Sequence, residues 1–120
     1  MKKILIIDDD IDTITAYSAF FKSKGYLVES AHNTKVGKKL INEFNPELII
    51  LDVMMDEPDE GFVFAQHLLD NKVKIPVIIT SSIAKAGQEI FDINIPNVKY
   101  LLQKPVDLDE LLKYTEKILS

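Results

Sequence analysis

Three carboxylates, a hydroxyl and an ammonium group follow four short apolar segments of this chain. The segments are residues 4–7, 48–51, 77–79 and 100–102. Continuous apolar runs of this length are typical of strands that are buried on both faces, as in a parallel sheet. Ligands of open α/β sheets bind outside the carboxyl ends of the strands, so the polar groups are expected to converge at one edge. They are Asp8, Asp9, Asp52, Thr80 and Lys104.

These residue types together suit phosphoryl transfer. Oxygen-rich acidic sites bind Mg²⁺, which takes one or two carboxylates together with phosphate oxygens. A carboxylate such as Asp52 can attack phosphorus and form an acyl phosphate. A metal held by the Asp8–Asp9 pair and the ammonium of Lys104 would neutralise charge on the transferred group. The Thr80 hydroxyl could donate a hydrogen bond to a phosphoryl oxygen, so each of the five residues has a role.

Length, charge and composition argue against several other classes of protein. A chain of 120 residues suits one domain, residues 1–120. The net charge of −5 argues against direct nucleic-acid binding by this domain. The chain has no cysteine, which excludes disulfides and thiolate metal sites. The apolar runs are far shorter than the roughly 20 residues that span a bilayer, and no cleavage site follows the first of them. We therefore expect no membrane association and a cytoplasmic location.

Strand and helix patterns alternate along the sequence. We place the helices where apolar residues recur with a period of 3.6. Their expected ends follow from capping residues such as Asn33 and Asp107 and from helix-breaking residues such as Gly25 and Pro46. The expected strands cover residues 3–7, 26–30, 47–51, 77–80 and 98–103. The expected helices cover residues 11–24, 33–44, 61–71, 84–91 and 107–119, of which 84–91 is the least regular.

Five βα units predict a flavodoxin-like, doubly wound α/β fold with a five-stranded parallel sheet and right-handed crossovers. The strand order 2-1-3-4-5 fits, because the second strand is the least apolar and suits an edge. In that order the first and third strands are neighbours, and the topological switch point lies between them. Asp8, Asp9 and Asp52 are therefore expected at the ligand crevice.

Four motifs resemble those of receiver domains of two-component response regulators, and the resemblance covers essentially the whole chain. Each motif alone is common, but all four occur in order and at suitable spacings. They are Ile-Leu-Ile-Ile-Asp8-Asp9-Asp10, Leu-Ile-Ile-Leu-Asp52-Val-Met-Met, Val-Ile-Ile-Thr80-Ser and Lys104-Pro105.

The resemblance implies a magnesium-dependent phosphoacceptor site. Asp52 would be the phosphoacceptor, and Asp8 and Asp9 would hold Mg²⁺, with Asp9 as a direct ligand and Asp8 acting through water. The backbone carbonyl of Met54 would complete the metal site.

The resemblance also implies how the phosphoryl group is held and where it comes from. Thr80 and Lys104 would bind the phosphoryl group, and the peptide bond between Lys104 and Pro105 would be cis. The phosphodonor would be a histidine kinase or a phosphotransfer protein. The domain would be a regulatory switch rather than an enzyme, and the sequence does not identify its output domain or partner.

Three features depart from the family pattern, and the last two concern the switch and partner surfaces. The acidic loop at residues 56–60 is one residue longer than usual, and residues 88–99 lack the usual small-residue turn. The aromatic expected three residues before Lys104 is replaced by Leu101, and Tyr100 lies one position earlier. Such an offset turns a strand side chain to the other face. Either Tyr100 points away from the usual switch pocket, or a bulge restores it.

Other interpretations of the same residues remain open at this point. Asp8 or Asp9 could cap the first helix, Thr80 could simply end a strand, and Lys104 could be a solvated loop residue. A haloacid-dehalogenase-like phosphatase would use Asp8 as nucleophile and Asp10 as general acid. A third possibility is a protein-interaction module that works without phosphorylation.

Overall fold

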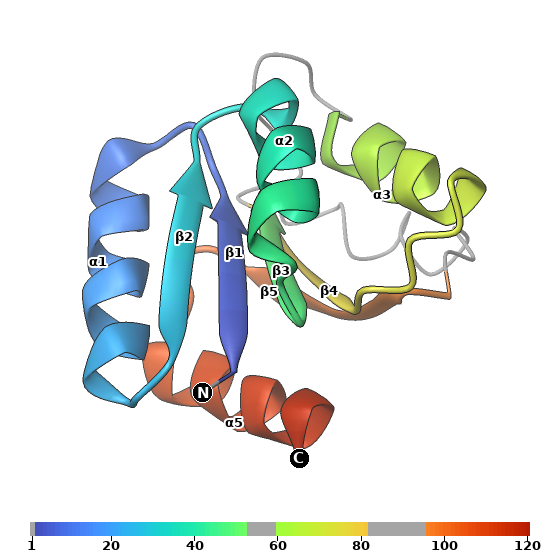
Figure 1. Cartoon of the computed structure of the whole chain (residues 1–120). Helices are drawn as coiled ribbons and strands as arrows, with labels where there is room; N and C mark the ends of the chain where they lie inside the picture. Colours follow the sequence, from blue (N-terminus) through green and yellow to red (C-terminus); the bar gives the residue numbers. More distant parts are fainter. Residues whose placement is uncertain (1, 53–59, 82–95) are drawn as a thin grey trace.

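A computed structural model of the chain describes residues 2–52, 60–81 and 96–120 (Figure 1). The expected helix at 84–91, Met54 and most of the acidic loop lie outside these residues. In chain order, the elements are β1 (Lys3–Ile7), α1 (Ile11–Ser23), β2 (Leu27–Ala31), α2 (Thr34–Phe44), β3 (Leu48–Asp52), α3 (Glu60–Asp70), β4 (Val77–Ser81), β5 (Val98–Gln103) and α5 (Leu108–Leu119).

The five strands form one parallel sheet in the order β2-β1-β3-β4-β5, as predicted. The three central strands are the most apolar segments of the chain, and β1, β3 and β4 are buried almost throughout. Strand β2 alternates between exposed and half-buried residues and lies at one edge. The amount of apolar sequence in each strand thus matches its place in the sheet.

Three strands, β2, β3 and β4, differ from the prediction by one residue at one or both ends. Strand β2 begins at Leu27 because the Tyr26 N–H donates to the Phe21 carbonyl, 3.1 Å away, and so closes α1 instead. Strand β3 extends to Asp52 because Asp52 pairs with Thr80 in the ladder. Strand β4 likewise extends to Ser81.

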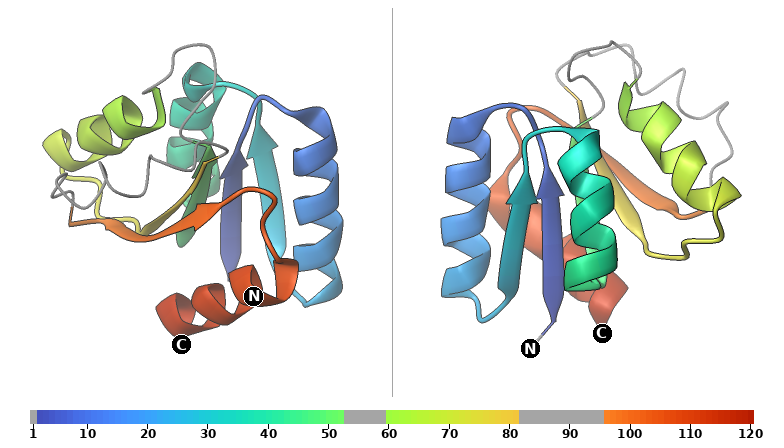
Figure 2. Two further views of the ribbon diagram at one scale, coloured as in Figure 1. Left: turned by 180° about the vertical axis from the view of Figure 1, so that it is seen from behind. Right: turned by 45° about the horizontal axis from the view of Figure 1, so that its top comes forward.

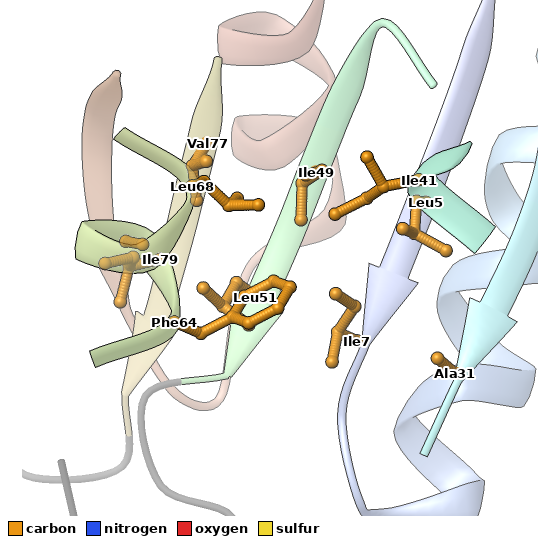
Figure 3. Packing of buried hydrophobic residues seen from close by; sticks show 11 residues of the cluster. Leu5, Ile7, Ala31, Ile41, Ile49, Leu51, Phe64, Leu68, Val77 and Ile79 are labelled. Atoms are coloured by element: carbon orange, nitrogen blue, oxygen red, sulfur yellow. The ribbon is translucent and has the colours of Figure 1, made fainter. Parts of the chain in front are cut away.

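Helices cover both faces of the sheet (Figure 2). Helices α2 and α3 pack on one face and α1 and α5 on the other. Figure 3 shows the α2–α3 side, which is almost entirely aliphatic. Its buried members are Leu5, Ile7, Ala31, Ile41, Ile49, Leu51, Phe64, Ala65, Leu68, Val77 and Ile79. The α1–α5 side contains Ile4, Ile6, Tyr17, Phe21, Leu48, Ile50, Ile78, Leu102 and Leu111.

Polar caps start three of the helices. Asp10 caps α1, Asn33 caps α2 through a 2.8 Å bond from the Val36 N–H, and Asp107 caps α5. Each side-chain oxygen accepts a backbone N–H that has no partner within its helix. No helix in the described ranges is long and apolar enough to cross a membrane.

Burial predicts that the two adjacent phenylalanines of α1 differ in their contribution to stability. Phe21 is fully buried, whereas Phe20 is only partly buried at the margin of the same cluster. We expect Phe21→Ala to lower the free energy of unfolding by about 3–5 kcal/mol through lost burial and a residual cavity. Phe20→Ala should cost less than half as much. Urea unfolding followed by circular dichroism would measure both, and equal losses would contradict the packing described here.

Candidate functional site

The carboxyl ends of three adjacent strands bring together residues that are far apart in the sequence. Asp8 directly follows β1, and its N–H continues the ladder by donating to the Ala31 carbonyl, 3.0 Å away. Asp52 ends β3 and is paired with Thr80 of β4. Because β3 lies between β1 and β4, Asp52 occupies the centre of this edge.

The three predicted carboxylates form one cluster. One oxygen each of Asp8, Asp9 and Asp52 lies within 4.8 Å of the other two. Asp8 and Asp52 are almost completely buried, with 2% and 4% of their surface exposed, whereas Asp9 is exposed. The cluster therefore has a buried base and one member that faces solvent.

Lys104 approaches this cluster from the far end of the chain. Its Nζ donates to Asp8 Oδ2 at 2.9 Å and lies 3.5 Å from Asp52 Oδ2. The Lys104 backbone N–H donates to the Ser81 carbonyl at 2.7 Å, which fixes the residue beside the end of β4. The peptide bond to Pro105 is cis, as the resemblance implied. Lys104 is therefore part of the cluster and not a solvated loop residue.

The pKa of Lys104 reflects two opposing effects. Burial alone would lower it, but the hydrogen bond that Lys104 donates to Asp8 and the charges of Asp8 and Asp52 outweigh burial and raise the pKa above its ordinary value. Lys104 thus stays cationic at neutral pH and offsets part of the negative charge. Burial also raises the pKa of the nearby Tyr17 hydroxyl, which stays protonated.

Thr80 contributes a hydroxyl without a partner. Its Oγ1 is buried and makes no hydrogen bond in the described part of the chain. A buried polar group in this state costs about 1–3 kcal/mol. Unpaired polar groups are rare in native cores, and each calls for an explanation. Here the hydroxyl lies next to Asp52 in the ladder, where it could donate to an oxygen of a bound group.

Asp10 is the N-cap of α1, a role that the sequence alone also allows for Asp8 or Asp9. Its carboxylate accepts the Asp12 N–H at 3.0 Å and the Thr13 hydroxyl at 2.9 Å. The hydrogen bond from Thr13 has the largest effect on the pKa of Asp10, and together the two hydrogen bonds lower it. The interpretation of Asp8 or Asp9 as the cap of α1 is therefore wrong. Asp10 is also bound to its own helix, which does not suit the general acid of a phosphatase.

Strand β5 contains a register shift before Tyr100. Val98 pairs with Val77, whereas Tyr100 pairs with Ile78, so Lys99 is an extra residue in the strand. An insertion of this kind is a β-bulge, and it changes which face the preceding residues point to.

The bulge leaves Tyr100 on the α5 side of the sheet. Its ring packs against that of Tyr114, with 4.2 Å between the centroids. Leu101, the position where the family has its aromatic, packs into the α2–α3 cluster instead. Because the bulge precedes Tyr100, it cannot bring this ring to the face of Leu101. The first of the two alternatives is confirmed, and Tyr100 points away from that face.

Comparison with known proteins agrees with this architecture. The family model that describes the response regulator receiver domain matches residues 4–116 of this chain. The probable C4-dicarboxylate response regulator DctR of Bacillus subtilis is 34% identical, with 96% of this chain and 51% of that protein covered. The DNA-binding dual master transcriptional regulator RpaA of Synechocystis is 31% identical over 99% of this chain and 49% of that protein. The chain thus spans about half the length of these two relatives.

Solved structures give the same result. The receiver domain of Francisella response regulator 1452 has a TM-score of 0.86 and 28% identity, covering 98% of this chain and 96% of that one. A two-component response regulator from Clostridium difficile has a TM-score of 0.88 and 25% identity, covering 99% and 96%. Fold, acidic cluster and family match agree: the chain belongs to the response regulator receiver domains of two-component systems, a family of phosphoacceptor switches.

Proposed function

We propose that this domain accepts a phosphoryl group on Asp52 from a histidine kinase or a phosphotransfer protein. The observation that carries the proposal is the setting of the Asp52 carboxylate. It lies at the centre of the edge, with Lys104 Nζ at 3.5 Å and the unpartnered Thr80 hydroxyl on the adjacent strand. A nucleophile, a cation and a hydrogen-bond donor thus meet at one place.

Asp8 is poorly suited to act as the nucleophile. Both oxygens of Asp8 accept hydrogen bonds at 2.9 Å, Oδ1 from the Asp10 N–H and Oδ2 from Lys104 Nζ. These bonds withdraw electron density from Asp8 and fix it in place. In the proposed step an Asp52 oxygen attacks phosphorus, the P–N bond of a phosphohistidine breaks, and the electron pair leaves with the imidazole. The product is an acyl phosphate on Asp52.

Lys104 and Thr80 would bind the transferred group. The ammonium of Lys104 would offset the negative charge of the phosphoryl oxygens, and the Thr80 hydroxyl would donate to one of them. Lys104 Nζ already lies 3.5 Å from Asp52 Oδ2, so its charge would act on the transferred group with little rearrangement. The cost of leaving the Thr80 hydroxyl unpaired would be recovered in the phosphorylated state. A shift of Thr80 toward the phosphoryl group would bias the surrounding surface.

The acidic cluster fits Mg²⁺. We assign the metal to the carboxylates of Asp8, Asp9 and Asp52, with Asp9 as a direct ligand because it is exposed and Asp8 acting through water because Lys104 holds its Oδ2. The Met54 carbonyl, proposed from the resemblance, lies outside the described residues. When bound, the metal would supply positive charge to the phosphoryl oxygens. The residues present suit a hard cation that prefers oxygen ligands.

We infer that residues 1–120 form one receiver domain that acts as a regulatory switch in the cytoplasm and not as a dedicated enzyme. The two relatives named above are about twice as long as the stretch they share with this chain. Output is therefore assigned to a further domain or a separate protein of unknown identity. With a net charge of −5, this domain is not expected to bind nucleic acid itself.

Phosphorylation of Asp52 can be tested by intact-mass spectrometry after incubation with Mg²⁺ and acetyl phosphate. We expect one added phosphoryl group on the wild type and none on Asp52→Asn, because an amide is a poor nucleophile. Asp70→Asn changes an exposed carboxylate at the end of α3 and serves as the matched control, which should be labelled normally. Full labelling of Asp52→Asn would rule out the assignment.

Thr80→Val should separate stability from function. The substitution keeps the shape of the side chain and removes a buried hydroxyl that has no hydrogen-bond partner among the described residues. We therefore expect a free energy of unfolding equal to or above that of the wild type, since about 1–3 kcal/mol of desolvation is relieved. Phosphorylation by acetyl phosphate should nevertheless slow by roughly tenfold, the effect of losing one hydrogen bond to a charged group. Loss of stability with unchanged labelling would contradict this role.

Mg²⁺ should stabilise the fold through the carboxylates. At a concentration tenfold above its Kd, Mg²⁺ should add roughly 1.4 kcal/mol to the free energy of unfolding and raise the melting temperature by several degrees. Asp9→Asn should abolish this increase without lowering the stability of the metal-free domain, because it relieves repulsion within the cluster. Asp70→Asn should keep the increase. An equal increase for all three proteins would place the metal elsewhere.

A further inference from the structure

A second concave site lies at the opposite end of the sheet from Asp52. It surrounds the start of β4 and β5 and is bounded by the carboxyl ends of α3 and α5. Its volume is about 740 Å³. Binding sites for small molecules typically measure about 300–1,000 Å³, so the cavity is large enough to hold one. None of the residues proposed for phosphoryl transfer lines it.

The walls of this pocket are mainly apolar. Leu69 and Val73 contribute from the end of α3 and the turn after it, Tyr100 from β5, and Ile118 from the last turn of α5. All four side chains are only partly buried in the protein itself. They could therefore bury further apolar surface against a ligand, and such burial favours binding.

Four lysines surround these apolar walls. Lys72 and Lys74 come from the connection between α3 and β4, Lys99 from the bulge of β5, and Lys117 from α5. Among the described residues, no carboxylate lines the pocket and none forms an ion pair with these lysines. Lys99 Nζ donates to the Pro96 carbonyl at 3.0 Å and Lys117 Nζ lies 5.9 Å from the centre of the Tyr114 ring, but neither contact neutralises the charge. This gathering of positive charge is notable on a chain with a net charge of −5. Neighbouring like charges repel one another, so an anion in the pocket would be stabilised.

Asn97 adds a buried polar group to the lining. Its backbone carbonyl accepts the Val77 N–H at 2.7 Å, which joins β5 to β4. The side chain, unlike the backbone carbonyl, makes no hydrogen bond. The residue is only 7% exposed, and neither Oδ1 nor Nδ2 has a hydrogen-bond partner in the described ranges. An amide without partners can both donate and accept. Few but well-placed polar groups of this kind orient ligands in otherwise apolar pockets.

We propose that this pocket binds a small organic anion with an apolar body. The apolar body would lie against Leu69, Tyr100 and Ile118, and the anionic group would pair with the surrounding lysines. The two polar atoms of the Asn97 amide are buried in the pocket wall, and after the side chain turns toward the cavity they would bond a polar atom of the ligand. The proposal is independent of the phosphoacceptor assignment, because it uses other residues at the other end of the strands.

A matched pair of dyes tests the charge requirement. The probe is 8-anilinonaphthalene-1-sulfonate, and the comparator is N-phenyl-1-naphthylamine, which has the same rings but no sulfonate. We expect saturable binding of one sulfonate probe per chain by fluorescence titration, at least about tenfold tighter than binding of the neutral dye. A cooperative melting transition in the presence of the probe would show that the folded domain is being measured. Equal affinities for the two dyes would overturn the proposal.

Two quadruple variants with the same net charge test the location. Replacing all four pocket lysines by glutamine, Lys72, Lys74, Lys99 and Lys117, should weaken binding of the sulfonate probe by about tenfold or more. The control replaces four exposed lysines elsewhere, Lys22, Lys35, Lys38 and Lys39. Its affinity should stay within about twofold of the wild type. Equal losses in both variants would mean that only overall charge matters and would refute the pocket.

Asn97→Leu tests the amide separately from the charges. Because the amide has no hydrogen-bond partner in residues 2–52, 60–81 and 96–120, its removal should leave the melting temperature unchanged or raise it. The sulfonate probe should nevertheless bind about fivefold more weakly, as expected for one lost hydrogen bond. Two-dimensional ¹H–¹⁵N NMR should also show the probe shifting the Asn97 side-chain resonances. Perturbations confined to the groove near Asp12, Tyr17 and Lys104 would instead assign binding to that groove and overturn the proposal.

Discussion

The charge balance at the carboxyl ends of β1, β3 and β4 depends on the contact between Lys104 and Asp8. The parallel sheet places three carboxylates within 4.8 Å of one another, two of them buried. Like charges this close repel by several kcal/mol in a protein environment. One ammonium, 2.9 Å from Asp8 and 3.5 Å from Asp52, offsets that repulsion. The bond joins residues 96 positions apart, so the charge balance of the site exists only in the folded chain.

The architecture could be predicted because it depends on local signals that agree with one another. Aliphatic runs mark the buried strands, and their order follows from the rules for connecting parallel strands. Once the order is known, Asp8, Asp52 and Thr80 must share one edge. The strand boundaries were less accurate because pairing decides them: Asp52 belongs to β3 through its partner on β4. Asp10 shows the same limit, since any of three consecutive aspartates could have capped α1.

Features that depend on long-range packing were not predictable from the sequence. Whether a bulge separates Tyr100 from Leu101 is decided by how β5 pairs with β4, and the observed bulge lies at Lys99, before both residues. The four lysines of the second pocket come from three separate parts of the chain and are unremarkable in sequence. Likewise, an asparagine before a strand is normally an exposed turn residue, and nothing local indicates that the Asn97 side chain is buried without a partner.

The buried polar atoms without partners in the described residues belong to Thr80 and Asn97 alone. Thr80 lies near the end of β4, and Asn97 directly precedes β5, at opposite ends of two paired strands. Between them the strands carry mainly aliphatic side chains, whose burial can offset the cost of such atoms. A fold this rich in apolar contacts can retain unpaired polar groups where a ligand meets the sheet. We therefore interpret both as adaptations to ligands, a phosphoryl group at one end of these strands and an organic anion at the other.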